Sequence, residues 1–308
     1  MNPIAYLCLQ YKRFREYTNF PVVLIGATAN RLEISIAVCV GSIYVSKLLS
    51  LDLSFGFHTS KNIIRLARVF KALLCCRVDL QNYYNGVSKL ASPRLSCLYP
   101  NPTPADPSKT LPKLVYHQFL TRTGQLASTL ANLGNITTAM YIATLDDTSQ
   151  EVVVKFTARY NEEAHRILAE AQLAPRLHYC ERVIGDLYMV VMDRVDGKSI
   201  WQLQEERKPV PEVVFKMFED AVLLHERNIV FGDLRDPNIL YVASKGSDKG
   251  CVNLVDFDWP EKNREGRYPA ALNLNNTWPE EVLPYGIMRL SHDLWQLDRL
   301  KALCVPGV

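Results

Sequence analysis

The stretch that decides the fold is Phe231-Gly232-Asp233-Leu234-Arg235-Asp236-Pro237-Asn238, followed further on by Leu254-Val255-Asp256-Phe257-Asp258-Trp259. Asn238 stands five residues after Asp233, and Asp256 ends a short apolar run. Phosphoryl transfer from ATP needs a carboxylate that accepts a hydroxyl proton, and oxygen ligands for Mg²⁺. We therefore expect Asp233 to act as the catalytic base and Asn238 and Asp256 to bind the metal.

Three segments upstream fit this chemistry in order. Val152–Phe156 is a β-branched run with one cation, Lys155, which is typical either of an ordinary surface strand or of a buried strand that points its amine into a cleft. Asn161–Glu170 has the periodicity of a helix. Its Glu162 or Glu163 can pair with Lys155, or both can form a solvated acidic first turn. An apolar strand running into a Gly turn follows at 187–197.

Four motifs in this order resemble a protein-kinase-like domain from about residue 115 to the end of the chain. Val153–Tyr160, Gly232–Arg235 and Asp256–Trp259 are similar to stretches of the compact kinase-like proteins abundant in fungi. The resemblance implies an α+β fold of two lobes with ATP in the cleft between them. The β-rich small lobe extends to about residue 192, and a shortened helical large lobe begins at about residue 196.

The resemblance also implies a role for each matching residue. Lys155 holds the α- and β-phosphates, Glu163 orients Lys155, Gly134 lies in the phosphate-covering loop, Met192 is the gatekeeper, the backbone of Asp193 and Val195 meets the adenine, Asp233 is the catalytic base, Arg235 lies near the γ-phosphate, and Asn238 and Asp256 bind Mg²⁺.

The chain departs from the kinase pattern at three positions. The phosphate-covering loop, 134–139, has one glycine where three are usual, so its backbone approaches phosphates less easily. Asp258 replaces the Gly of D-F-G and adds a carboxylate near the metal. Gly232 replaces the Arg that usually precedes the catalytic Asp, which leaves no obvious anchor for a phosphorylated activation loop. A constitutive or differently regulated site is the simpler expectation.

The large lobe is expected to be truncated after its central helix. Asp293, in Ser291–Leu297, resembles the buried Asp that braces the catalytic loop, although an exposed polar residue at a helix start fits the same pattern. A clean A-P-E motif is missing, and Trp278-Pro279-Glu280 can substitute for it. We expect the last three helices of an ordinary protein kinase, which help to dock protein substrates, to be missing.

Three functions are compatible with these motifs. The first is an ATP- and Mg²⁺-dependent protein kinase acting on Ser or Thr. The second is a pseudokinase that serves as a nucleotide-binding scaffold; the retained Lys155, Asp233, Asn238 and Asp256 argue against it, and the poor glycine loop argues for it. The third is a phosphotransferase acting on small molecules, because aminoglycoside and choline phosphotransferase-like enzymes have a similar G-D-L-x-x-x-N stretch.

Composition limits the partners and the compartment. A formal charge of +3 over 308 residues, without blocks of Lys and Arg, gives no support to nucleic-acid binding. The eight cysteines show no C-x-x-C pair, so a zinc site or a disulfide framework is not expected. A reducing cytoplasm or nucleus fits best, and we expect no membrane partner.

Residues 1–92 are predicted to form an N-terminal extension, and the prolines of residues 93–113 to form a linker to the kinase-like domain at 114–308. The apolar stretch 34–51 is long enough for a membrane helix. Its serines, Lys47 and many β-branched residues instead favour strands of a buried hairpin. An amphipathic helix is expected from Ser60 to about Leu90, lying against the small lobe.

Overall fold

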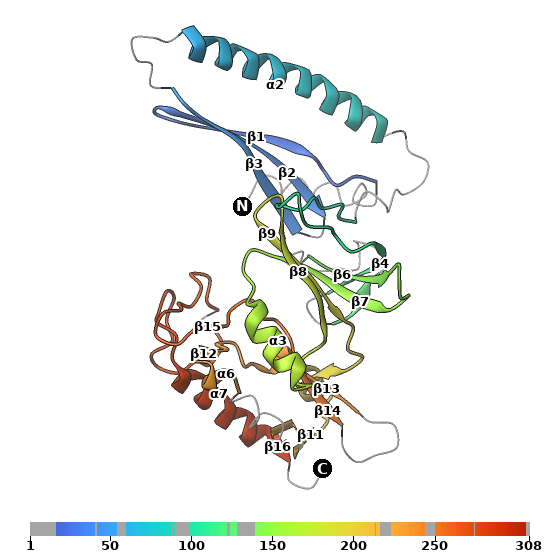
Figure 1. Ribbon diagram of the computed structural model, residues 1–308, viewed down its shortest axis with the longest axis vertical. Coiled ribbons are helices and arrows are strands. Elements are labelled where there is room, and N and C mark those ends of the chain that lie inside the picture. The colour runs from blue at the N-terminus through green and yellow to red at the C-terminus, as the bar shows by residue number, and fades with distance from the viewer. Residues whose placement is uncertain are drawn as a thin grey trace.

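Figure 1 shows the computed structural model, an α+β fold in which a three-stranded sheet and a long helix precede a six-stranded sheet and a C-terminal lobe of helices and short strands. The structure describes residues 17–40, 42–53, 60–87, 89, 99–121, 124–127, 139–212, 214–215, 223–243, 250–273 and 275–305.

The N-terminal sheet is an antiparallel meander of β1 (Val22–Thr28), β2 (Arg31–Val40) and β3 (Ser42–Asp52). The apolar stretch 34–51 therefore lies in two strands, as its β-branched residues predict. These strands are less buried than expected, because Ile36 and Leu48 have 38% and 57% of their surface exposed. No helix within the described residues is both long and apolar enough to cross a membrane.

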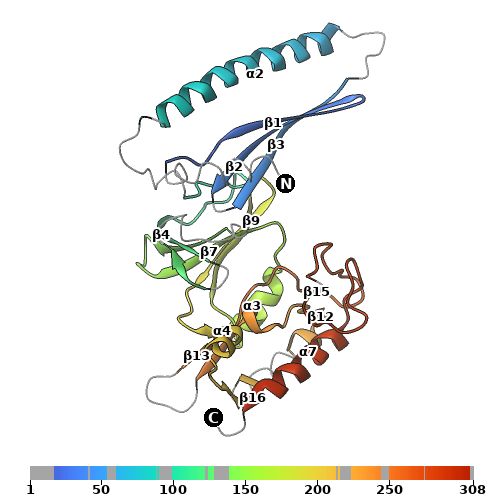
Figure 2. The same ribbon diagram turned by 180° about the vertical axis from the view of Figure 1, so that it is seen from behind.

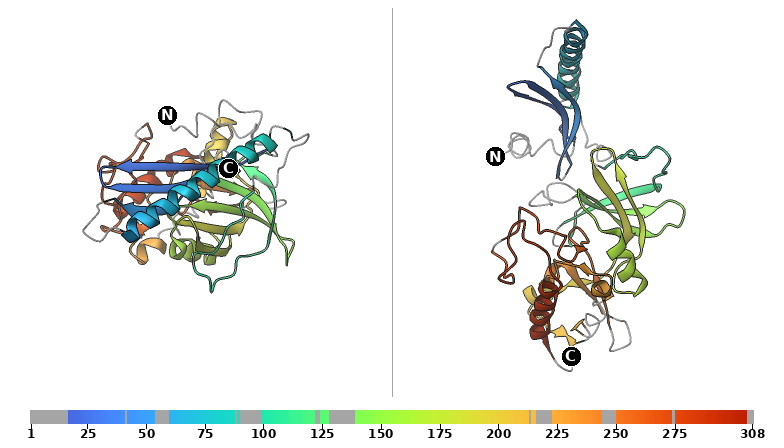
Figure 3. Two further views of the ribbon diagram at one scale, coloured as in Figure 1. Left: turned by 90° about the horizontal axis from the view of Figure 1, so that it is seen from above. Right: turned by 60° about the vertical axis from the view of Figure 1, so that its left-hand side comes forward.

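Helix α2 (Ser60–Val87) covers one face of this sheet. Leu66, Val69 and Leu73 pack against a small buried cluster of the sheet that includes Leu32 and Ile34. The helix thus packs on the N-terminal sheet and not, as expected, on the small lobe. Figures 2 and 3 show the sheet between α2 and the rest of the molecule.

The central sheet has the strand order β5-β4-β6-β7-β9-β8, and all of its neighbours are antiparallel. Its core contains Tyr141, Val152, Val154 and Val191, each with at most 1% of its surface exposed. The strands are β4 (Leu114–Leu120), β5 (Leu126–Ala127), β6 (Ala139–Leu145), β7 (Glu151–Thr157), β8 (Leu177–Val183) and β9 (Leu187–Asp193).

The second half of the predicted linker packs against the central sheet. Tyr99 stacks on Tyr116 and Phe119, with ring centroids 5.6 and 5.4 Å apart. The backbone N–H of Ala105 donates to the Arg182 carbonyl of β8 at 2.9 Å. These contacts fix residues 99–105 to the sheet.

The largest buried cluster of the C-terminal lobe joins helix α3, Phe257, the hairpin β13–β14 and helix α7, and a second cluster includes Val230, Tyr268 and Met288. Asn238 immediately precedes that hairpin, and Asp256 lies just after its end. The elements are α3 (Glu162–Glu170), β10 (Lys198–Ser199), α4 (Ile200–Glu205), β11 (Val210–Pro211), α6 (Leu223–Glu226), β12 (Ile229–Val230), the 3₁₀ turn η5 (Asp236–Asn238), β13 (Ile239–Val242), β14 (Cys251–Leu254), β15 (Glu261–Lys262), α7 (Leu290–Leu303) and β16 (Cys304–Val305).

Candidate active site

Asp233 lies in the loop between β12 and η5, with 3% of its surface exposed. Arg235 hydrogen-bonds to both carboxylate oxygens of Asp233: its Nε donates to Oδ1, and its Nη2 donates to Oδ2 at 2.8 Å. Asn238 Nδ2 donates to Oδ2 at 2.9 Å and to the Asp233 carbonyl at 3.0 Å. Burial raises the pKa of Asp233 above its ordinary value, although Arg235 opposes the shift. The carboxylate is thus fixed in position and is more basic than an exposed Asp.

The backbone of this loop is held from α7. Asp293 Oδ2 accepts the N–H of Phe231 at 2.7 Å, and its Oδ1 accepts the N–H of Gly232 at 2.8 Å. Gln296, one turn later, accepts the N–H of Leu234 at 3.0 Å. The predicted contact of a buried Asp293 with the catalytic loop is therefore confirmed.

Two tryptophans surround Arg235 on its other side. Its guanidinium carbon lies 5.2 Å from the ring centre of Trp278 and 5.8 Å from that of Trp259, and the two indoles stack on each other. Such cation–π contacts restrict where the guanidinium can move. Sequence reasoning noted both tryptophans but not this contact, since Trp278 lies 43 positions after Arg235 and no local pattern joins them.

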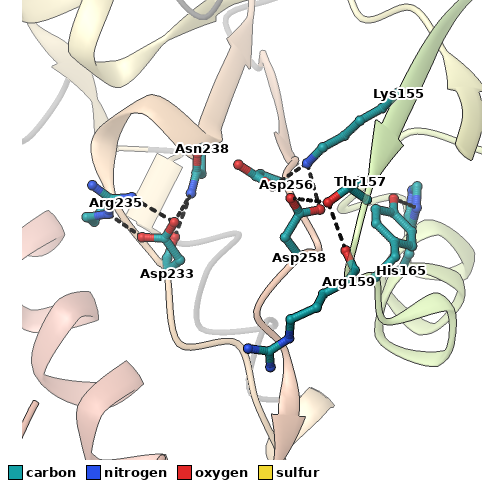
Figure 4. A network of polar contacts seen from close by, with 10 residues as sticks. Lys155, Thr157, Arg159, His165, Asp233, Arg235, Asn238, Asp256 and Asp258 are labelled. Atoms are coloured by element: carbon teal, nitrogen blue, oxygen red, sulfur yellow. Dashed lines mark hydrogen bonds and ion pairs between the residues drawn. The ribbon is translucent and has the colours of Figure 1, made fainter. Parts of the chain in front are cut away.

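Lys155 is buried on β7, and its Nζ donates to two carboxylates. One is Asp256 Oδ1 at 2.6 Å, and the other is Asp258 Oδ1 at 2.7 Å. Burial alone would lower the pKa of Lys155, but the charges of the two carboxylates outweigh it and the pKa lies above its ordinary value. Figure 4 shows Lys155, Asp256 and Asp258 facing the group formed by Asp233, Arg235 and Asn238.

The structure does not bring Glu163 to Lys155. Glu163 is in the first turn of α3, its side chain has 54% of its surface exposed, and its carboxylate lies 3.6 Å from Lys262. Glu162 instead pairs with Arg166 one turn along the same helix. The expected pairing of Glu163 with Lys155 is therefore absent, and the carboxylates that Lys155 contacts are those of Asp256 and Asp258.

The residues expected to contact the nucleotide base lie on β9 and just after it. Met192 is buried in β9, and Asp193 ends this strand with its carboxylate bonded to His178 and Gln150, each at 2.5 Å. Val195 follows between β9 and β10. Gly134 lies outside the described residues. The backbone contacts of Asp193 and Val195 with adenine stay a prediction.

The residues near Asp256 suit a hard cation. Asn238 uses its amide nitrogen to hold Asp233, which directs its amide oxygen to other partners. Asp256 and Asp258 contribute carboxylates, so the donor set consists of oxygen atoms, as Mg²⁺ prefers. Asp256 has φ of 71°, in the left-handed region that residues other than glycine seldom adopt.

Comparisons with known proteins agree with these motifs. No protein-family model matches the chain. The chain is 29% identical over 135 residues to a cGMP-dependent protein kinase of Drosophila melanogaster, isozyme 2 forms cD5/T2, covering 39% of this chain and 13% of that protein. It is 27% identical over 165 residues to mitogen-activated protein kinase kinase kinase ANP1 of Arabidopsis thaliana, covering 47% of this chain and 24% of that protein.

Among solved structures, the chain resembles the Cydia pomonella Granulovirus kinase PK-1, with a TM-score of 0.39 and 16% identity over 53% of this chain and 62% of that chain. The matched region spans a quarter or less of the length of the two curated relatives. The sequence matches support the protein-kinase-like superfamily that the motifs indicate, and the described residues form an α+β fold that fits a shortened two-lobed kinase-like arrangement. The resemblance to compact fungal proteins stays a prediction.

Proposed function

We propose that the chain transfers the γ-phosphoryl group of ATP, with Mg²⁺, to the Ser or Thr hydroxyl of a protein. Phosphoryl transfer by a kinase-like protein is the function that the relatives support, and two of them are named as protein kinases. The observation that carries the proposal is the buried Asp233 carboxylate, fixed by Arg235 and Asn238 and facing Lys155 and Asp256 (Figure 4).

Each residue has a task in this reaction. Asp233 orients the acceptor hydroxyl and accepts its proton, and its raised pKa makes it a better base. Arg235 offers N–H donors to charge that develops on the transferred group. Lys155 donates to phosphate oxygens of the nucleotide. Asn238 and Asp256 would hold Mg²⁺, which neutralises phosphate charge when it is bound.

The test compares the wild-type chain with Asp233→Asn. Asp233 is needed for proton transfer and not for holding ATP, so the variant should bind ATP within about threefold of the wild type and lose turnover by about 10²-fold or more. Asn also keeps the side-chain shape, and melting curves check that the variant folds. Binding is measured by calorimetry and turnover by ³²P transfer from ATP.

The acceptor is identified by running the same assay against a Ser/Thr peptide library and a panel of aminoglycosides and small alcohols. Label on peptides supports a protein kinase, and label on small molecules alone supports a small-molecule phosphotransferase. If the wild type binds ATP but shows no transfer or hydrolysis above the Asp233→Asn background, the enzyme hypothesis is wrong and the chain is a pseudokinase scaffold. Asp298→Asn, an exposed carboxylate on α7, is the matched control and should change neither quantity.

A further inference from the structure

The two carboxylates that hold Lys155 come from one short segment, 256–258, which follows β14. Protein-kinase-like patterns place a glycine at the position of Asp258 and a helix Glu beside the lysine. Here the helix candidate, Glu163, is exposed and lies near Lys262. The lysine therefore keeps two acidic partners although the helix supplies none of them.

We propose that Asp258 positions Lys155 for the nucleotide phosphates, in the role that the kinase pattern gives to the helix glutamate. This inference rests on the proposed function, because it concerns the same nucleotide site. Asp258 is a positioning residue, since it acts through the lysine.

Asp258 is itself held at both oxygens by one strand. Its Oδ1 accepts from Lys155, and its Oδ2 accepts from the hydroxyl of Thr157 at 2.9 Å. Side chains two residues apart on a strand lie on the same face, so Lys155 and Thr157 reach the carboxylate side by side from β7. A carboxylate with one fixed oxygen presents the other in a defined direction, which fixes the direction of the Lys155 amine.

Helix α3 contributes by holding the segment that carries Asp258. His165 stacks on Phe257, with ring centroids 4.3 Å apart and planes 6° from parallel. At the helix start, Asn161 donates its backbone N–H to the Phe257 carbonyl and its Nδ2 to the Pro260 carbonyl, both at 2.9 Å. The residues on either side of Asp258 are thus anchored to α3, and the helix reaches the lysine through them.

Direct metal ligation is the competing role for Asp258, and the two roles differ in their need for metal. A positioning carboxylate affects how Lys155 binds phosphate whether or not Mg²⁺ is present. A metal ligand affects nucleotide binding only when the metal is there. Binding of ADP in EDTA therefore isolates the positioning role.

The experiment measures ADP affinity of the full chain by calorimetry in EDTA for Lys155→Ala, Asp258→Asn, Glu163→Gln and the double variant Lys155→Ala/Asp258→Asn. We expect Lys155→Ala to weaken binding by about tenfold and Asp258→Asn to reproduce most of this loss. The double variant should lose less ADP affinity than the product of the two single losses, by about threefold or more, because residues in contact are energetically coupled. Glu163→Gln should match the wild type.

Thr157→Val is a second, near-isosteric variant that releases the outer oxygen of Asp258 and leaves the carboxylate in place. It should weaken ADP binding in the same direction by a smaller factor, whereas Asp258→Glu should restore part of what Asp258→Asn loses. With MgATP, Asp258→Asn should raise KM for ATP more than it lowers kcat. Melting curves in EDTA without ADP check that each variant is folded.

The inference is overturned if Asp258→Asn binds ADP like the wild type in EDTA, or if Glu163→Gln alone causes the loss. A wild type that binds ADP and shows these couplings but transfers no phosphate would defeat the proposed function and leave the inference standing. If the wild type transfers phosphate but Asp258→Asn binds ADP as the wild type does, the proposed function stands and this inference is wrong. Absence of any ADP binding would defeat both.

Discussion

Gly232 shows how a single residue is matched to the site. It has φ of 79°, in the left-handed region, and a Cβ placed on it would lie 2.8 Å from Cε of Met288. Its N–H donates to Asp293, so the backbone cannot rotate without losing that bond. The Arg that protein kinases commonly carry here would be strained at this position. The loop backbone therefore requires a glycine at this position. The same glycine also means that the Arg that usually anchors the activation loop is absent.

The first prediction at this scale is that Gly232→Ala lowers the free energy of unfolding by about 1–3 kcal/mol, because a left-handed alanine is strained and crowds Met288. Gly86→Ala is the matched control. Gly86 lies in α2 with nothing within 4 Å of its added Cβ, so that substitution should be neutral or should stabilise by about 0.5 kcal/mol. Urea unfolding measures both, and equal effects would contradict the argument.

At the residue scale, the sequence predicts residues whose role follows from their side-chain chemistry and from their close spacing in the sequence. Asp233 and Asn238 meet because the turn η5 brings residues five apart into contact. The contact of Gly232 with Met288 and that of Arg235 with Trp278 each join residues more than 40 positions apart. No local pattern in the sequence carries that information.

Helix α3 is the element whose role the structure changes most. Its apolar face, with Ala164 and Leu168 fully buried, joins the core of the C-terminal lobe as its periodicity predicts. Its acidic first turn faces outward. Whether a glutamate at the start of a helix reaches a lysine depends on how the helix sits on its neighbours. The sequence could therefore predict the helix and its buried face but could not choose between the two readings of Glu163.

His165 anchors α3 and gives it a pH dependence. Its Nε2 contacts the Pro175 carbonyl at 2.7 Å, and its Nδ1 contacts the Tyr160 hydroxyl at 2.6 Å. A carbonyl can only accept, so Nε2 donates and Nδ1 of the neutral ring accepts from the tyrosine. Burial lowers the pKa of His165 to about 4, because a protonated ring would lose solvation in this position.

We predict that His165 lowers the free energy of unfolding in acid. The unfolded chain takes up the proton below about pH 6.5, whereas the folded chain resists it until about pH 4. Within this window the unfolded state binds more protons, so the free energy of unfolding falls as the pH is lowered, by about 3 kcal/mol in total from this group. The contribution is fully present above pH 6.5.

The variant His165→Phe keeps an aromatic ring against Phe257 but cannot titrate. Urea unfolding from pH 7.5 to pH 4 should give a shallower dependence of the free energy of unfolding on pH than the wild type has. Between pH 7.5 and 8.5 the two curves should run parallel, whatever the difference in absolute stability. Parallel curves through the whole acid range would contradict the depressed pKa.

At the scale of the whole molecule, the buried clusters fall into two separate groups. Counting the described residues alone, the two small clusters of the N-terminal part contain residues up to Leu73, and the clusters of the central sheet and C-terminal lobe contain residues from Tyr99 onward. The sequence predicted a hairpin and a helix here from period and composition. It did not predict that they would form a layer of their own, because the pairing of a helix face with a sheet face depends on tertiary packing.

The last prediction follows from this separation. Helix α2 packs on its sheet through Leu66, Val69 and Leu73, the hydroxyls of Tyr83 and Tyr84 hydrogen-bond to Thr18 and to the Pro21 carbonyl, and most of its other residues are exposed. Few buried contacts give a low free energy of local opening. Amides of α2 should therefore exchange with deuterium much faster than those of β6, β7 and β9, whose side chains form the buried core of the central sheet.

Leu73→Ala tests whether the N-terminal part opens as its own unit. The substitution removes a contact between α2 and the sheet, so it should speed exchange in α2 and in β1–β3. Exchange in β7 and β9 should stay unchanged, since in the part of the chain that the structure describes their buried residues share no cluster with α2. Leu74→Ala, on the neighbouring position with 64% of its surface exposed, should leave all of these rates alone. Faster exchange of the central sheet in Leu73→Ala would mean that the two parts unfold together. Stability lost in one cluster speeds exchange in another only when both clusters belong to one cooperative unit.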